Sequence, residues 1–266
     1  MFKLSSSNKY ISLKTPKYFF RVGGSVSNDI HPANDEISQL RELLTIRFSS
    51  EELKALSEAL SDMHNEVVAY TFIDDDCLFC NEAVKLMNTI SRASPQHNNE
   101  KLLKHVVIHK SGHRELFERL NIERVPTIIL LNGAIRYIGV PAGEEIRGLV
   151  ETIIRISTGE TGLSRNVIRK LESIDCNVKI RVIVTPLCPY CPYAVLLANM
   201  IALEDFKAGR RNITIEIVEA FENTDIADSY GITNVPAIII NDSLAYVGVP
   251  YEDEFVEMMR STCRKL

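Results

Sequence analysis

The sequence lacks any apolar run long enough to cross a membrane. A bilayer-spanning helix needs roughly 20 consecutive, mostly apolar residues, and no stretch of the 266 residues approaches that length. The N-terminal residues also lack the short apolar core of a secretory signal peptide. Together these absences predict a cytoplasmic protein that has no membrane partner.

The chain also lacks an excess of positive charge and has few cysteines. Its 30 Lys and Arg residues are outnumbered by 35 Asp and Glu residues, so it offers no basic field that would attract nucleic acid. Six cysteines are too few to make a disulfide scaffold of a chain this long. The composition therefore predicts a globular protein that does not bind nucleic acid and uses its cysteines for redox or metal chemistry.

Four of the cysteines form two C-x-x-C pairs, at matching places in two halves of the chain. The first pair is Cys77 and Cys80, and the second is Cys188 and Cys191. In each half the C-x-x-C pair is followed by a Val-Pro dipeptide, which begins an apolar run. A Tyr-x-Gly-Val-Pro sequence comes after that run. The offsets agree, since 188 − 77 = 111 and 248 − 139 = 109. A period of domain size indicates tandem duplication.

The repeat predicts two domains of one fold behind an N-terminal extension. We expect residues 1–48 to be an extension of unknown role, 49–158 the first domain and 159–266 the second. Each domain reads as strand, helix, strand, helix, strand, strand, helix. The strand-helix-strand unit implies a parallel pair, and the short link before the last strand requires a hairpin. The expected fold is α/β, with a mixed central sheet flanked by helices in each domain.

The extension itself has two parts. Apolar residues at helical spacing from Ile37 to Leu44 predict a short docked helix, whereas the first 30 residues are expected to be loosely ordered. A second helix is expected from about residue 51 to 63, after an N-cap at Ser49 or Ser50. The role of the extension cannot be inferred from the sequence.

The C-x-x-C pairs are expected at helix N-termini, because the helical patterns begin at Cys77 and Cys188. Unpaired backbone N–H groups and the positive end of the helix dipole favour thiolate there, so these two cysteines are predicted to be the nucleophiles. Cys80 and Cys191, one turn further on, are predicted to resolve the mixed disulfide. This exchange needs no cofactor besides the cysteine pairs and no metal.

The two sites are not expected to be equal. Asp74, Asp75 and Asp76 precede Cys77, and negative charge opposes thiolate formation by on the order of 1 kcal/mol for each close exposed charge. A helix end favours thiolate by only about 0.3–1 kcal/mol. The residues around Cys188 carry no charge. We therefore predict that Cys188 is the faster nucleophile at neutral pH.

Residues 185–192, Thr-Pro-Leu-Cys-Pro-Tyr-Cys-Pro, together with Val235-Pro236 and the weaker repeat upstream, resemble the tandem thioredoxin-fold protein disulfide oxidoreductases. These are also called glutaredoxin-like proteins of thermophilic prokaryotes. The resemblance covers residues 49–266. It implies a dithiol–disulfide oxidoreductase that reduces, forms or isomerises protein disulfides, in a cytosol where disulfides persist. A thioredoxin-reductase-like flavoenzyme and a peroxiredoxin are the possible redox partners.

The same resemblance implies how substrates are held. It predicts that Pro126 and Pro236 are cis, so that the backbone groups of Val125 and Val235 are free to pair with an extended substrate. These four residues are therefore the expected substrate-binding positions. None of them is expected to bind metal.

The sequence departs from related families at several positions. Single-domain thioredoxins carry a buried acid six residues before the first cysteine, whereas Thr71 and Val182 stand there in this chain. The transfer of protons to and from the cysteines must therefore differ from that in single-domain thioredoxins. Cys-Pro-Tyr-Cys also resembles glutaredoxin, but Arg124 and Asn234 replace the threonine that precedes Val-Pro in that family. A glutaredoxin-type, glutathione-dependent reductase is the alternative function.

The cysteines and histidines also allow other roles. The two C-x-x-C pairs could form a structural zinc site if they met in space, or the first half could be a redox-inactive interaction module. Cys176 and Cys263 have no C-x-x-C partner and are expected to be small buried hydrophobic residues rather than a disulfide. The histidines at positions 105, 109 and 113 are spaced too widely along a strand to chelate one ion.

Overall fold

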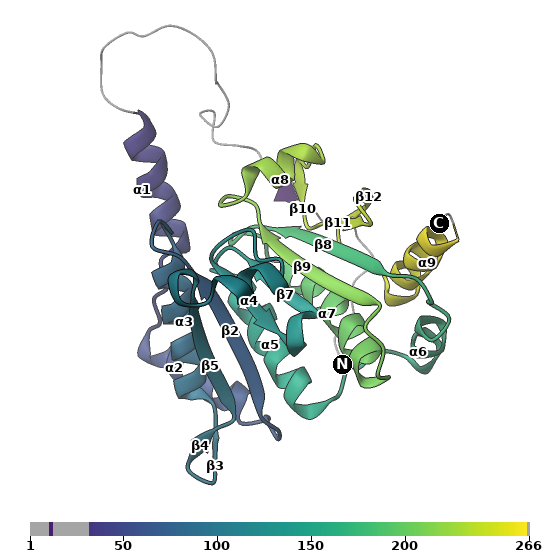
Figure 1. Cartoon of the computed structure of the whole chain (residues 1–266), viewed down its shortest axis with the longest axis horizontal. Helices are drawn as coiled ribbons and strands as arrows, with labels where there is room; N and C mark the ends of the chain where they lie inside the picture. Colours follow the sequence, from purple (N-terminus) through teal and green to yellow (C-terminus); the bar gives the residue numbers. More distant parts are fainter. Residues whose placement is uncertain (1–10, 13–31, 265–266) are drawn as a thin grey trace, which may run out of the picture.

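A mixed β-sheet forms the centre of the molecule (Figure 1). The computed structural model describes residues 11–12 and 32–264. Within them the sheet has eight strands in the order β12-β11-β8-β9-β7-β6-β2-β5. The strands are β2 (Val67–Ile73), β5 (Leu103–His109), β6 (Thr127–Leu130), β7 (Ile135–Ile138), β8 (Val178–Val184), β9 (Ile213–Glu219), β11 (Ala237–Ile240) and β12 (Ser243–Val247).

Each half contributes four neighbouring strands, in the same arrangement. In the first half β2 is parallel to β5 and antiparallel to β6, and β6 forms a hairpin with β7. The second half repeats this with β8, β9, β11 and β12. The halves then join through a parallel pairing of β7 with β9, in which Tyr137 lies opposite Ile217. The predicted α/β fold with mixed sheets is confirmed, but the joining of the two sheets into one was not predicted.

Helices enclose a large apolar core against this sheet. They are α1 (Pro32–Leu44), α2 (Ser50–Leu60), α3 (Cys80–Ala93), α4 (Arg114–Arg119), α5 (Glu145–Thr158), α6 (Arg165–Leu171), α7 (Cys191–Lys207), α8 (Thr224–Ser229) and α9 (Glu252–Cys263). The large core takes buried side chains from α2, α3, α5, α6, α7 and α9. A smaller core under α4 contains Phe72, Ile108, Phe117 and Ile129. Helices α5 and α7 pack together across the junction of the two halves (Figure 1).

Two small strand pairs lie outside the central sheet. β3 (Gln96–His97) and β4 (Glu100–Lys101) form a small hairpin. The isolated strand β1 (Ile11–Ser12) pairs antiparallel with β10 (Asn234–Val235), beside which it lies in Figure 1. Apart from residues 11 and 12, the first 30 residues, for which loose order is predicted, lie outside the described residues. The predicted helix is confirmed as α1, but of its side chains that the structure describes only that of the last residue, Leu44, is buried, whereas Ile37 and Leu43 are exposed.

Two sequence predictions need correction. The helices after the C-x-x-C pairs begin at Cys80 and Cys191, three residues later than predicted, because the first cysteine of each pair lies in the preceding turn. Cys176 and Cys263 form a disulfide, so the prediction of two unpaired buried cysteines was wrong. The end of α9 lies beside the turn before β8 and brings the two Cα atoms to 5.7 Å. Contact between residues so far apart in the chain had no local signal.

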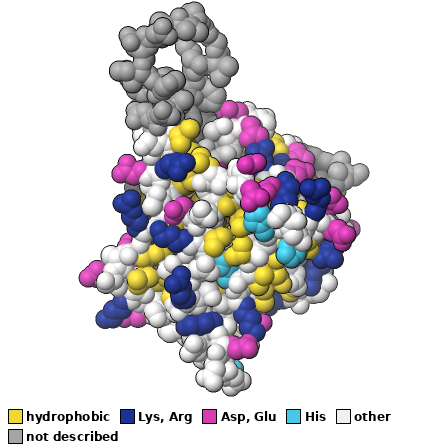
Figure 2. All heavy atoms as spheres, turned by 60° about the vertical axis from the view of Figure 1, so that its left-hand side comes forward, with side chains coloured by type: hydrophobic (Ala, Val, Ile, Leu, Met, Phe, Trp, Pro, Cys, Tyr) yellow, Lys and Arg dark blue, Asp and Glu magenta, His cyan; other side chains and the backbone are white. Residues whose placement is uncertain are grey.

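The surface agrees with the composition. On the face shown in Figure 2, acidic and basic side chains are interspersed, and histidine side chains lie among them. Among residues 32–264, no helix combines the length and apolar character that crossing a bilayer requires.

Candidate redox sites

Both C-x-x-C pairs lie at the same edge of the sheet. β2, β7, β9 and β8 all run in one direction, so their carboxyl ends share an edge, and the pairs follow β2 and β8. Three strands separate β2 from β8, which places these strands about 19 Å apart at the usual strand spacing. One tetrahedral zinc ion, with bonds to sulfur of about 2.3 Å, cannot bridge that distance. Each pair instead forms its own disulfide.

The second pair is placed where thiolate is stabilised. The backbone N–H of Cys191 donates to Cys188 Sγ over 3.0 Å, at the start of the 17-residue helix α7. A donor aimed at the sulfur of a reduced cysteine would favour its charged form, which is the effect that the sequence analysis expects of a helix N-terminus. Both sulfur-bearing side chains are fully buried, so the site is closed in this disulfide state.

The first half covers part of this second site. The backbone N–H of Glu144 donates to the Pro186 carbonyl over 2.9 Å, two residues before Cys188. One turn further along α5, Gly148 lies against Pro192, where a Cβ would come within 3.3 Å of the proline Cα. The second redox site is therefore built against the first half and is not an independent unit.

The two Val-Pro bonds are both cis, as the resemblance implied. Val235 is buried and belongs to β10, whose edge carries β1, with Ile11 opposite Val235. Pro236 and Pro126 are buried, whereas Val125 is partly exposed. The backbone edge at Val235 thus pairs with an extended segment of the chain itself.

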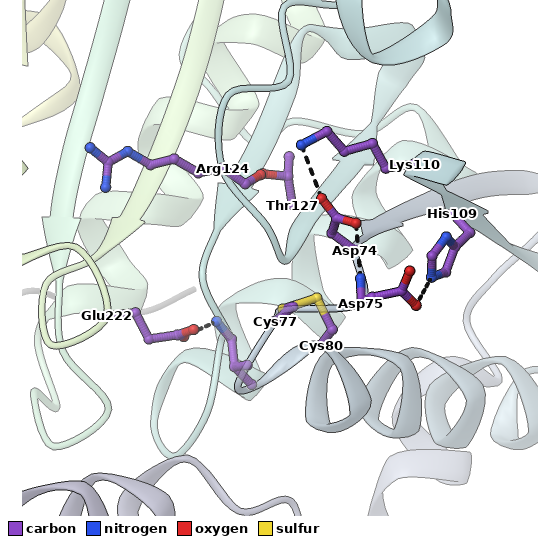
Figure 3. Close-up of a disulfide and its surroundings, with 10 residues drawn as sticks. Asp74, Asp75, Cys77, Cys80, His109, Lys110, Arg124, Thr127 and Glu222 are labelled. Carbon is purple, nitrogen blue, oxygen red and sulfur yellow. Dashed lines mark hydrogen bonds and ion pairs between the residues drawn. A yellow bond between two sulfur atoms is a disulfide. The ribbon is translucent and has the colours of Figure 1, made fainter. Parts of the chain in front are cut away.

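The first site has polar partners that the sequence did not reveal. Lys110 lies 2.9 Å from Asp74, and His109 lies 3.2 Å from Asp75, beside the Cys77–Cys80 disulfide (Figure 3). The hydrogen bond from Lys110 holds the pKa of Asp74 below its ordinary value. His109 ends β5 and Lys110 follows it, and β5 is paired with β2. The charge of Lys110 offsets part of the repulsion expected from the aspartate run. The sequence could not place these residues because the contacts depend on strand pairing.

Exposure also distinguishes the two sites. Cys77 is partly exposed, while Cys80 is buried at 4%. Thr71, which has the sequence position of the buried acid of single-domain thioredoxins, belongs to a series of hydrogen-bonded side chains. Thr71 Oγ1 is 2.8 Å from His105 Nε2, and His105 Nδ1 is 2.9 Å from Asn88 Oδ1. Burial lowers the pKa of His105 to about 4, so its imidazole is neutral at pH 7. Within the described residues, no three His, Cys, Asp or Glu side chains are grouped to hold a metal.

Sequence reasoning missed three carboxylates near the junction of the halves, of which Glu145 and Glu219 are buried and Glu222 is half-buried. Glu145 begins α5, Glu219 ends β9, and Glu222 follows it. Glu222 accepts a hydrogen bond from the backbone N–H of Val140 in the first half, and this contact appears in Figure 3. Burial raises the pKa of Glu222 to about 7. No local pattern marks these residues, because only the joining of the two sheets buries them.

Comparisons with known proteins agree with this geometry. The thioredoxin-domain family model matches residues 178–260, which contain the second C-x-x-C pair. The thioredoxin of Methanocaldococcus jannaschii is 34% identical over 83 residues, which are 31% of this chain and 93% of that protein. The sequence relationship therefore centres on the second half.

A solved structure extends the relationship to both halves. A protein disulfide oxidoreductase from Aeropyrum pernix matches 83% of this chain and 96% of its own, with 43% identity and a TM-score of 0.81. The alkylhydroperoxide reductase AhpF of Enterococcus faecalis shares the fold at 19% identity, 80% and 99% coverage, and a TM-score of 0.70. The fold and its paired cysteines define a thioredoxin-fold dithiol–disulfide oxidoreductase. The chain belongs to the thioredoxin-fold protein disulfide oxidoreductases.

Proposed function

We propose that Cys188 attacks the disulfide of a protein substrate and that Cys191 resolves the mixed disulfide. The observation that carries this proposal is the N–H of Cys191 aimed at Cys188 Sγ at the start of α7. Such a donor favours the thiolate of the first cysteine, and the second cysteine is one turn away for resolution. Cys77 and Cys80 form a second site with the same roles. Residues 49–158 and 159–266 are the two proposed domains.

The proposed substrate is an extended segment of a disulfide-containing protein, bound at the edges next to Pro126 and Pro236. The pairing of β1 with β10 supports this proposal, because it occupies the backbone edge of Val235 with an extended strand. Val125 has the same place in the first half. Backbone pairing makes few demands on the side chains of the substrate, which suits an enzyme that acts on many proteins.

We further propose a cytoplasmic protein that exchanges electrons with other thiol systems. A thioredoxin-reductase-like flavoenzyme is the proposed donor, and a peroxiredoxin is a proposed acceptor. The direction of net transfer follows from the reduction potentials of these partners.

Trapping tests the proposed chemistry. In a Cys191→Ala variant the mixed disulfide on Cys188 cannot be resolved, so substrates are expected to remain attached to the protein and to be released by dithiothreitol. Mass spectrometry of the released proteins identifies the substrates and the donor. A Cys188→Ser, Cys191→Ala variant is the matched control. Failure of the single variant to retain any more protein than this control would contradict the assignment.

The ranking of the two nucleophiles is tested by alkylation across pH. We expect the midpoint of iodoacetamide alkylation to lie at lower pH for Cys188 than for Cys77, because Asp76 and the neighbouring aspartates oppose ionisation of Cys77. The pH midpoint separates acidity from access, which matters because Cys77 is the more exposed cysteine. Peptide mapping gives both midpoints in one experiment. A lower midpoint for Cys77 would reverse the ranking.

A further inference from the structure

Arg124 stands directly before the cis Val125-Pro126 bond of the first site, and the proposed function gives its side chain no role. Asn234 has the corresponding place in the second half. The side chain of Asn234 is short and donates to its neighbour Thr233 over 3.2 Å. A long cationic side chain at this place therefore distinguishes the first site from the second.

The side chain of Arg124 reaches across the junction to the second half. Its Nη1 donates to Asp225 Oδ1 over 3.0 Å, and its Nη2 donates to Asp225 Oδ2. The same Nη1 donates to Asn223 Oδ1 over 3.3 Å. Figure 3 shows the side chain extended away from the Cys77–Cys80 disulfide. Two parallel bonds to one carboxylate fix the orientation of the guanidinium, which is not directed at the reacting sulfur atoms.

The acceptors of Arg124 are themselves held in place. Asn223 is 4% exposed, and its Nδ2 donates to the Glu219 carbonyl over 2.9 Å and to the Ile138 carbonyl over 3.4 Å. Since Ile138 belongs to the first half, Asn223 is bonded to both halves. The hydrogen bond from Arg124 holds the pKa of Asp225 below its ordinary value, so this carboxylate is charged at neutral pH.

The backbone of Arg124 is fixed as well. Thr127 Oγ1 donates to the Arg124 carbonyl over 2.7 Å, and Thr127 is a buried residue at the start of β6. Between these two residues, the N–H and C=O of Val125 take part in no hydrogen bond with the described part of the chain. The corresponding Val235 is paired with Ile11 instead. The edge at Val125 is thus a short open segment that is fixed on both sides.

Folding stability does not explain the link between Arg124 and Asp225. The two side chains are 36% and 65% exposed, and ion pairs this exposed contribute little to the free energy of folding. Position matters more for binding. An edge that pairs with an extended chain must hold its N–H and C=O at hydrogen-bond distance from that chain. A misplacement of about 1 Å can reduce the rate of an enzyme about a hundredfold.

We propose that Arg124 is a positioning residue that holds the substrate-binding edge of the first site, with Asp225 of the second half as its anchor. The proposal rests on the proposed binding of an extended substrate at Val125 and Pro126. Arg124 takes no part in the exchange of sulfur bonds. Its loss should therefore weaken substrate binding and leave the chemistry of Cys77 unchanged.

Single-turnover kinetics of the full chain test this proposal. In a Cys188→Ser, Cys191→Ser background only the first site reacts. The protein is reduced, freed of reductant and mixed with an excess of a disulfide-linked pair of short peptides. The Cys77 and Cys80 thiols form their disulfide, and both peptides leave as thiols, so two electrons pass to the substrate. Release of a fluorescent peptide thiol gives the half-saturating concentration and the limiting rate.

Arg124→Ala is expected to raise the half-saturating concentration at least about fivefold and to change the limiting rate less than about twofold. Asp225→Ala should have the same effect. The double variant should be no worse than either single variant, because each removes the same link. The reaction with dithiobis(nitrobenzoate), a small disulfide without a peptide backbone, should be unaltered in all three variants.

Two controls separate positioning from a general loss of structure. Arg119→Ala, which removes an exposed cation of α4 in the same half, should leave both kinetic parameters unchanged. In a Cys77→Ser, Cys80→Ser background, Arg124→Ala should leave peptide reduction by the second site unchanged. This second result requires an intact fold.

Three results would overturn the proposal. They are an unaltered half-saturating concentration in Arg124→Ala, additive effects in the double variant, and an equal loss at the second site. Failure of the parent first site to reduce either disulfide would instead contradict the proposed function, so the two failures are distinguishable.

Discussion

Replacing both Cys176 and Cys263 with serine is expected to lower the free energy of unfolding by about 4 kcal/mol. The disulfide joins residues separated by 87 positions, and closing so long a loop removes much of the conformational freedom of the unfolded chain. Both cysteines lie away from the C-x-x-C turns, so thiol–disulfide exchange should be retained. Denaturant unfolding under non-reducing conditions measures the difference.

The matched control for this prediction is the Cys77→Ser, Cys80→Ser variant. Its disulfide closes a separation of only three residues, so its loss should cost much less. Equal unfolding free energies for the parent and the Cys176→Ser, Cys263→Ser variant would show that this disulfide does not form in solution or does not stabilise the fold.

Gly143→Ala is expected to destabilise the protein by more than about 3 kcal/mol and to disturb the second redox site. Gly143 has a φ of +58°, and an added Cβ would lie 2.3 Å from the Pro186 carbonyl oxygen. The backbone at Gly143 and the backbone at Pro186 cannot move apart without shifting the turn that carries Cys188, because the N–H of Glu144 donates to the same Pro186 carbonyl. Overpacking of this kind typically costs about 1–3 kcal/mol, in addition to about 1–2 kcal/mol for the left-handed backbone.

Gly159→Ala provides the control for backbone conformation alone. Gly159 has a φ of +73°, but nothing lies within 4 Å of an added Cβ. Its substitution should cost only about 1–2 kcal/mol and leave the pH midpoint of Cys188 alkylation unchanged. Denaturant unfolding and iodoacetamide alkylation measure both variants. An equal loss of unfolding free energy in Gly143→Ala and Gly159→Ala would mean that the contact between Gly143 and Pro186 is not rigid.

The expectation for Gly143 has its physical basis in the junction between the halves. The parallel pairing of β7 with β9 aligns the two sheets, and the packing of α5 on α7 places Gly143 and Gly148 against the prolines that flank the second redox site. The two copies of the active site are therefore not independent of each other. One copy supplies part of the surroundings of the other.

Sequence patterns were sufficient for most features that depend on near neighbours in the chain. The strands at 67–73, 178–184 and 213–219 each coincide with a run rich in β-branched residues, which favours a strand irrespective of distant contacts. The C-x-x-C spacing identified Cys188 and Cys191 before the fold was known. The local register of helix starts was less accurate, since the first cysteine of each pair remains in the preceding turn.

The sequence by itself determined that this chain is a duplicated protein with two cysteine pairs suited to disulfide exchange. Only the tertiary structure decided how the two pairs differ. Strand pairing brought Lys110 to Asp74, and the junction of the halves set Gly143 and Gly148 against the prolines that flank the second turn. The physical reason is that charge and burial at a site depend on which distant segments pack there, and a short motif carries no record of those contacts.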